Sequence, residues 1–183
     1  MEQEREWLQQ ALWGDTEAFG QLVQAYERPV YNLAYRMLGN AAEAEDAAQE
    51  TFLRAYTKLA TYQPERKFVN WLLSIASHYC IDRLRKSQRA PQVSLEDPLP
   101  PQWLTSDAPR PDQEVSKKQS RDLVRKMLDR LPDVYRAAVV LRYWYGLSYS
   151  EIAETMGTTE SAIKSRLHRA RRMLAQDLQS ARA

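Results

Sequence analysis

The chain has 183 residues, of which 44% are hydrophobic and 27% charged, and its net charge is +2. This length suffices for one ordinary domain or two small ones. No apolar run approaches the roughly 18 residues that a membrane span needs, and the acidic start "MEQEREWLQQ" lacks the layout of a secretion signal. The lone cysteine, Cys80, excludes an internal disulfide framework and fits a reducing compartment. We therefore expect a cytoplasmic protein that does not insert into membranes.

Charge is segregated along the chain. Residues 1–50 carry ten acidic and three basic side chains, whereas residues 51–90 carry eight basic and two acidic ones. Residues 91–112 are acidic again, and residues 113–183 hold fourteen basic against eight acidic side chains. Two basic blocks separated by an acidic spacer indicate two contacts with a polyanion. The acidic first block would be repelled by that polyanion, so it should face another partner.

The first half has the three-four spacing of amphipathic helices and no convincing alternation of period two. The spaced apolar sets are Tyr26, Val30, Leu33, Ala34, Met37 and Leu38; Ala48, Phe52, Tyr56 and Leu59; and Phe68, Trp71, Leu72, Ile75 and Tyr79. Within "EAEDAAQE", Glu45, Asp46 and Gln49 fall on one helix face, because residues three and four apart are neighbours there. An acidic surface helix with no binding role would show the same spacing of these residues.

A linker follows. Six of the nine prolines lie in residues 91–112, and paired prolines cannot sit inside helices. The chain thus divides into domains 1–90 and 113–183. Fully extended, the 22 residues of the linker span at most roughly 70 Å, which is about two turns of B-DNA. One chain could therefore touch two sites on one duplex.

The second half predicts a helix-turn-helix. "LPDVYRAAVVLRYWYG" indicates a helix capped at Pro132 or Asp133 and stopped by Gly146. "SYSE" then supplies a capping box, with Ser148 as N-cap and Glu151 three residues later. The short helix that it opens ends at Gly157, and Thr158 or Thr159 caps a helix that runs to about Leu174 or beyond. This is the shape that places its last helix in a major groove.

The last helix combines a buried stripe with a basic outer face. The stripe consists of Ile163, Leu167, Ala170 and Leu174, and the outward residues are Lys164, Ser165, His168 and Arg169. Lys and Arg donate to guanine O6 and N7, and Ser and His bond base edges or phosphates. Arg166, Arg171 and Arg172 point to the flanks, where phosphates would lie. The alternative is a solvated basic face that complements the helix dipole.

The segment "LPDVYRAAVVLRYWYGLSYSEIAETMGTTESAIKSRLHRARRML" resembles region 4 of the bacterial sigma-70 family, in its extracytoplasmic-function (ECF) group. It departs from the usual pattern at Ser161 and Ala162, where Gly and Thr are common. "EAFGQLVQAYERPVYNLAYRMLGNAAEAEDAAQETFLRAY" resembles regions 2.1 and 2.2, and "FVNWLLSIASHYCIDRLRK" resembles regions 2.3 and 2.4. Together these motifs cover about four-fifths of the chain.

The resemblance implies an all-α protein of two small helical domains: sigma region 2 over 1–90 and sigma region 4 over 113–183. It implies that Glu45, Asp46 and Gln49 bind core RNA polymerase, on the clamp of its beta and beta-prime subunits. It also implies that the segment before Trp71 and the helix after it bind and help melt the minus-ten element. The candidates there are Arg66, Lys67, Phe68, Asn70, Ser74, His78, Arg83 and Lys86. The minus-thirty-five candidates are Lys164, Ser165, Arg166, His168, Arg169 and Arg172.

His78 stands where Asn is usual in the family, a departure that either changes the preferred minus-ten base or marks a surface site that tolerates substitution. Trp71 has the spacing of a core residue rather than of a stacking residue. The pair His78 and Cys80 falls far short of a zinc site, and the chain holds no phosphate loop or nucleophile motif. We expect no enzyme activity, no metal and no cofactor.

The expected partners are core polymerase, promoter DNA and, by resemblance, an anti-sigma factor. We expect the free chain to be a monomer. The alternative function is a stand-alone helix-turn-helix repressor or activator. Such a protein usually dimerises on a palindrome, whereas a sigma factor binds asymmetric, spaced elements.

Overall fold

The computed structural model describes residues 2–88 and 122–180, so the proline-rich linker lies outside the described residues. The first half consists of α1 (Glu2–Leu12), α2 (Thr16–Leu38), α3 (Ala41–Lys58), the 3-10 turn η1 (Leu59–Thr61) and α4 (Phe68–Ser87). The second half has a helix over 122–129 and then α6 (Asp133–Tyr143), α7 (Tyr149–Thr155) and α8 (Glu160–Ser180). The described residues contain no strand, which confirms the all-α prediction.

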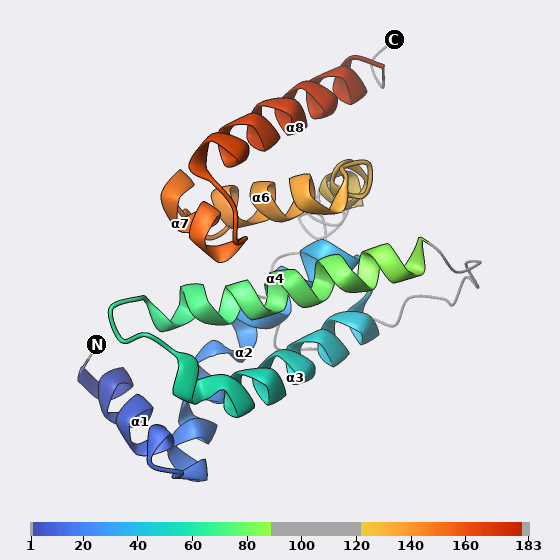
Figure 1. Ribbon diagram of the computed structural model, residues 1–183. Helices are drawn as coiled ribbons and strands as arrows, with labels where there is room; N and C mark the ends of the chain where they lie inside the picture. The colour runs from blue at the N-terminus through green and yellow to red at the C-terminus, as the bar shows by residue number, and fades with distance from the viewer. Residues whose placement is uncertain (1, 89–121, 181–183) are drawn as a thin grey trace, which may run out of the picture.

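The N-terminal half is a bundle built around α2. Asp15 caps this helix, accepting hydrogen bonds from the N–H groups of Glu17 at 2.8 Å and Ala18 at 3.1 Å. Gly39 ends it at φ 73°, a left-handed conformation that favours glycine. Asn40 then caps α3 by accepting from the N–H of Glu43 at 2.9 Å. Helix α2 packs against α1, α3 and α4, and α3 packs against α4 (Figure 1).

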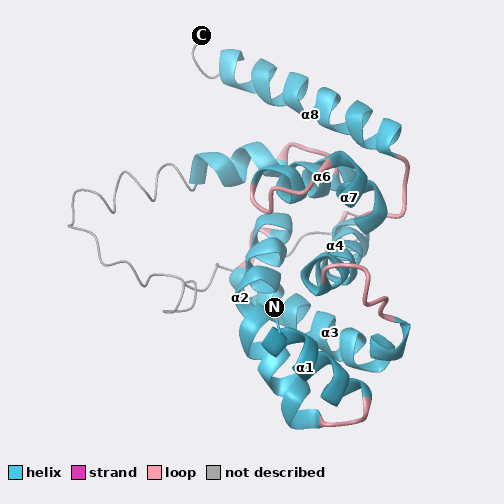
Figure 2. Ribbon diagram, turned by 90° about the vertical axis from the view of Figure 1, so that its left-hand side faces the viewer, coloured by secondary structure: helices cyan, strands magenta, loops and turns pink. Residues whose placement is uncertain are grey.

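The C-terminal half has the predicted helix-turn-helix. Pro132 precedes α6, Ser148 caps α7, and the predicted capping box is present. The N–H of Ala162 donates to Thr159 Oγ1 at 3.2 Å, so Thr159 is the residue that caps α8. Helix α8 packs across α6 and α7. Figures 1 and 2 both show it on the far side of these two helices from α4.

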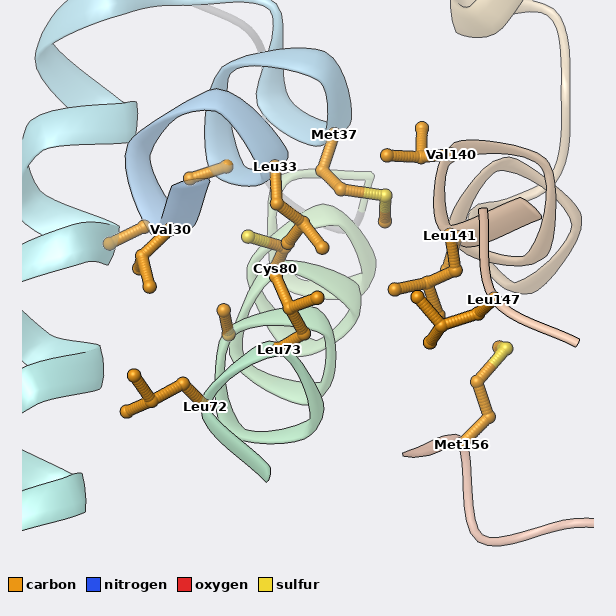
Figure 3. Packing of buried hydrophobic residues seen from close by; sticks show 14 of the residues in the cluster. Val30, Leu33, Met37, Leu72, Leu73, Cys80, Val140, Leu141, Leu147 and Met156 are labelled. Carbon is orange, nitrogen blue, oxygen red and sulfur yellow. The ribbon is translucent and has the colours of Figure 1, made fainter. Parts of the chain in front are cut away.

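The two halves share one continuous apolar cluster. Helix α6 contacts both α2 and α4, and α7 contacts α4. In Figure 3, Met37 of α2 points toward Val140 of α6, while Leu141 and Leu147 face α4. All four side chains are at most 5% exposed. At about 25 cal/mol per Å² of apolar surface, such burial is the main force that holds the halves together.

Candidate polymerase and nucleic-acid interfaces

The acidic residues of α3 lie on its outer surface. Glu45, Asp46 and Gln49 are exposed, while Ala44 and Ala47 are fully buried against the bundle. Small alanines let α3 lie close to its neighbours and leave the acidic side chains on the opposite face. This face is therefore open to a basic partner.

Sequence reasoning missed an apolar extension of this surface. Leu53 is 64% exposed, and it lies one turn beyond Gln49, four residues along the same helix. Tyr56, which belongs to an apolar set of three-four spacing, is 43% exposed and packs edge-on against Phe19 at 5.0 Å between ring centroids. The sequence did contain a sign that Leu53 is exposed: it is a large aliphatic residue that does not belong to the regularly spaced apolar set of α3.

The segment before α4 is held by aromatic packing. Tyr62 O–H donates to the Arg66 carbonyl at 2.6 Å, and the N–H of Arg66 donates to the Gln63 carbonyl at 3.0 Å. Phe68, the first residue of α4, packs edge-on against Tyr62 at 5.3 Å between ring centroids. These contacts fix the backbone from which Arg66 and its neighbour Lys67 project.

Phe68, one of the predicted minus-ten residues, lies in the core in this conformation. Its ring is 1% exposed and is surrounded by Tyr26, Tyr62 and Trp71. Phe68 therefore supports the segment from below. Trp71 is half-buried in the same cluster and lines a cavity of about 530 Å³, so its core assignment holds in part.

Four predicted minus-ten residues gather around that cavity: Arg66, Lys67, Asn70 and Ser74. The cavity's opposite wall is formed by Glu151, Glu154 and Thr155 of α7. Arg66 and Lys67 are exposed, whereas Asn70 and Ser74 are half-buried. The structure thus brings these four predicted minus-ten residues together, and they face α7 of the C-terminal half across the cavity.

The remaining minus-ten candidates lie further along α4. His78 is exposed, and its Nδ1 lies 2.7 Å from the Ser74 carbonyl, so this ring nitrogen donates. Arg83 reaches Glu43 at 3.7 Å, and Lys86 is exposed. Cys80, by contrast, is fully buried, and burial raises the pKa of its thiol to about 12. His78 and Cys80 therefore face apart.

The basic face of α8 has the predicted arrangement. Ile163, Leu167 and Ala170 are at most 2% exposed and pack inward. The outward side carries the exposed residues Lys164, Ser165, His168, Arg169 and Arg172, with Arg166 half-buried at its edge. Arg169 Nη1 donates to the Tyr135 hydroxyl at 3.3 Å, and Lys164 lies 3.5 Å from Glu160 on the same helix. The face is positive and open.

The two halves also exchange polar contacts that the sequence did not predict. Arg66 Nε lies 2.8 Å from Glu154 Oε1, and Lys67 Nζ lies 3.1 Å from Glu151 Oε1. Asn70 Nδ2 donates to the same Glu151 oxygen at 3.3 Å. Two carboxylates of the helix-turn-helix thus occupy the donors of the predicted minus-ten surface.

In the described part of the chain, no group of three His, Cys, Asp or Glu side chains is arranged to hold a metal ion. None of the helices described for residues 2–88 and 122–180 is both long and apolar enough to cross a membrane.

Comparisons with known proteins identify both halves. Residues 22–90 match the family description "Sigma-70 region 2", and residues 121–174 match "Sigma-70, region 4". The chain is 36% identical over 176 residues to "ECF RNA polymerase sigma factor SigW" of Bacillus subtilis (strain 168), covering 93% of this chain and 94% of that protein.

Two solved structures share the fold. The "Structure of CnrH in complex with the cytosolic domain of CnrY" matches with a TM-score of 0.70 and 24% identity, covering 97% of this chain and 98% of that one. The complex of "the sigma factor RpoE" with "the anti-sigma factor NepR from Bartonella quintana" matches with a TM-score of 0.64 and 22% identity, covering 88% and 96%. With both regions matched and a relative similar over nearly its whole length, the chain belongs to the sigma-70 family of RNA polymerase sigma factors, in the ECF group.

Proposed function

We propose that this chain is an alternative sigma factor that binds core RNA polymerase and directs initiation at promoters with minus-thirty-five and minus-ten elements. The observation that carries the proposal is the presence of three distinct surfaces on one chain of this family. They are the exposed acidic face of α3, the segment 66–86 with its basic and amide groups, and the open basic face of α8.

In this proposal Glu45, Asp46 and Gln49 contact a basic surface of polymerase, and exposed Leu53 extends that contact. An interface with an apolar centre and charged surroundings suits specific association, because charges steer the encounter and apolar area supplies affinity. The acidic charge of α3 also keeps this face away from DNA.

Arg66, Lys67, Asn70, Ser74, His78, Arg83 and Lys86 bind the minus-ten element as its strands separate. Basic groups hold the backbone of an unpaired strand, and amide or hydroxyl groups bond the edges of unstacked bases. Phe68 and Tyr62 hold this segment in place from the core.

Lys164, Ser165, His168 and Arg169 of α8 read the minus-thirty-five element in the major groove, with Arg166 and Arg172 at its edges. A helix with a buried stripe on one side and donors on the other can enter a groove without disturbing its own domain. We assign the chain to the cytoplasm, where polymerase acts, and propose an anti-sigma factor as a further partner, as in the CnrH–CnrY and RpoE–NepR complexes.

The test is a titration of the purified chain against bacterial core RNA polymerase, followed by transcription from a pool of genomic promoters. We expect tight one-to-one binding and new, specific start sites. A folded chain that fails to bind polymerase, and that dimerises on a palindromic site, would instead be a stand-alone repressor or activator.

A further inference from the structure

The turn between α1 and α2 presents a tryptophan to solvent. Trp13 is 90% exposed, and Leu12, the last residue of α1, is 43% exposed. Single exposed apolar residues are common on protein surfaces, so exposure alone does not mark a binding surface. The backbone of the turn, the cavity at its side and the surface next to it are what distinguish this one.

The backbone of the turn is fixed by hydrogen bonds. The N–H of Gly14 donates to the Ala11 carbonyl at 3.0 Å, and the N–H of Asp15 donates to the Gln10 carbonyl at 3.0 Å. This pair of bonds closes a helix in a Schellman motif, and Gly14 has the left-handed φ of 95° that the motif requires. Asp15 then caps α2 directly. Trp13 is therefore held in place before any partner binds, which lowers the entropy cost of binding through it.

Helix α1 is itself anchored on α2. Leu8 and Ala11 are at most 7% exposed and pack into the bundle. The Tyr26 hydroxyl of α2 donates to Glu4 Oε2 at 2.7 Å near the other end of α1. The turn is thus a fixed corner of the N-terminal half.

An open cavity of about 330 Å³ lies at this corner, between α1 and α2. Half-buried Trp7 supplies an aromatic wall, and Asp15 and Glu17 supply two carboxylates. Asp15 Oδ1 accepts both hydrogen bonds of the α2 cap, which leaves Oδ2 for a partner. An aromatic ring beside two carboxylates suits a guanidinium or ammonium group, because such a cation is attracted by both.

The corner continues the exposed surface of α3. Phe19, in the first turns of α2, packs edge-on against Tyr56 of α3, and Tyr56 lies one helical turn beyond Leu53. In Figures 1 and 2 the α1–α2 turn and the C-terminal end of α3 both lie at the end of the bundle away from α6, α7 and α8. Exposed apolar side chains therefore extend from the acidic face of α3 toward Trp13.

Charge indicates what kind of partner fits the corner. Residues 1–20 carry five acidic side chains and one basic one. DNA would be repelled by this surface, whereas a basic protein surface would be attracted. The acidic face of α3 has the same preference, so one basic protein partner suits both surfaces.

We propose that the α1–α2 corner is a second docking point for core RNA polymerase. Trp13 inserts into an apolar pocket of polymerase, and an Arg or Lys side chain of polymerase enters the cavity beside Trp7, Asp15 and Glu17. The proposal rests on the proposed function for the polymerase contact of α3, which it extends to a separate element of the chain. A rigid tryptophan surrounded by charged groups has the composition of a binding hot spot.

The first test is a titration of core polymerase with the wild-type chain and with Trp13→Ala and Glu17→Gln. Loss of a tryptophan hot spot should weaken binding by about thirtyfold or more. Glu17→Gln should weaken it about three- to tenfold, and more at low salt than at high salt, because it removes one charge of an ion pair. Trp13→Phe keeps an aromatic anchor and should retain more affinity than Trp13→Ala.

The matched control is Glu27→Gln. Glu27 is also an exposed acid of α2, but it lies ten residues, or about 15 Å, further along the helix than Glu17. Its loss should change polymerase affinity by less than about twofold. All variants should keep the circular dichroism of the wild type and its affinity for a minus-thirty-five duplex, since each altered side chain is exposed.

The second test identifies what covers the corner. A photoreactive p-benzoylphenylalanine in place of Trp13 should cross-link the chain to the beta or beta-prime subunit in the polymerase complex. Mass spectrometry should place the cross-link next to an Arg or Lys of that subunit. A cross-link between two copies of this chain instead, or no cross-link to polymerase, would overturn the proposal.

These outcomes separate the proposal from the proposed function. If the wild type binds polymerase and Trp13→Ala and Glu17→Gln bind equally well, the corner is not a docking point, although the chain is still a sigma factor. Equal losses for Glu17→Gln and Glu27→Gln would assign the effect to overall charge and would also overturn the cavity contact. A folded wild-type chain that binds no polymerase would refute both.

Discussion

Glu151 serves two structural purposes with its two oxygens. Oε2 accepts a hydrogen bond from the N–H of Ser148 at 2.8 Å, which completes the capping box of α7. Oε1 accepts hydrogen bonds from two side chains of the other half, Lys67 Nζ at 3.1 Å and Asn70 Nδ2 at 3.3 Å. The Ser148 N–H and then the Lys67 ammonium lower the pKa of this carboxyl to about 2. One residue thus both starts a helix and ties the halves together.

This depressed pKa predicts a pH dependence of stability. A carboxyl whose pKa is lower in the folded than in the unfolded state stabilises the fold above its unfolded pKa and loses that effect as the pH falls. The free energy of unfolding of the wild type should exceed that of E151Q by a constant amount above about pH 4.5. The difference should shrink as the pH falls toward about 2. Urea unfolding of both chains at several pH values measures it, and a difference independent of pH would contradict the role of Glu151.

At the scale of single helices, the exposed face of α3 can be altered without touching the core. Asp46 and Gln49 are exposed, and the buried alanines beside them are unchanged in the double variant Asp46→Arg with Gln49→Ala. We expect core polymerase binding to weaken by about 1–3 kcal/mol, since a reversed charge faces a basic partner. Binding of the minus-thirty-five duplex should stay normal. Titration with polymerase and titration with the duplex measure the two affinities. A normal polymerase affinity of the double variant would refute the assignment of this face of α3 to polymerase.

The face of α8 predicts two kinds of effect on DNA binding. Lys164→Ala with Arg169→Ala should cost roughly 1–3 kcal/mol for each good base contact and relax the sequence preference. Arg172→Ala should instead weaken all duplexes alike and make the salt dependence of log affinity less steep by about 0.9. Duplex binding at several salt concentrations, with matched and scrambled sites, separates the two. Identical behaviour of the two variants would mean that α8 does not read bases.

Local features of these helices could be predicted because they are encoded by neighbouring residues. The capping box of Ser148 and Glu151 and the buried stripe beginning at Ile163 each depend on spacings of three or four. The pairing of Arg66 with Glu154 could not be predicted, since it joins residues far apart in sequence through the docking of two domains. The burial of Phe68 could not be predicted either, because a core aromatic and a stacking aromatic have the same spacing, and only the surrounding Tyr26 and Tyr62 distinguish them.

At the scale of the whole molecule, the halves behave as one packed unit. Met37 of α2 and Val140 of α6 are both fully buried and face each other (Figure 3). Arg136, only 6% exposed, adds a hydrogen bond to the Met37 carbonyl and an ion pair with Asp129 at 3.1 Å. Burial lowers the pKa of this guanidinium, while Asp129 acts in the opposite direction. A buried cation at the junction is costly unless its partners stay in place, so the docked arrangement is specific.

This coupling predicts that the free chain unfolds in a single transition. A charge introduced at the junction between the halves should instead give two separate unfolding transitions. Met37→Lys places an ammonium among apolar side chains and beside Arg136, which should cost at least about 2 kcal/mol of docking free energy. Urea unfolding followed by circular dichroism should then show two transitions, one for each helical half. The matched variant Met37→Leu keeps the volume and should keep one transition. The lysine variant should also lose the cross-link that a zero-length carbodiimide can form between Lys67 Nζ and Glu151 Oε1, which lie 3.1 Å apart in the docked arrangement. A single transition with the cross-link intact would show that the halves do not depend on this junction for docking.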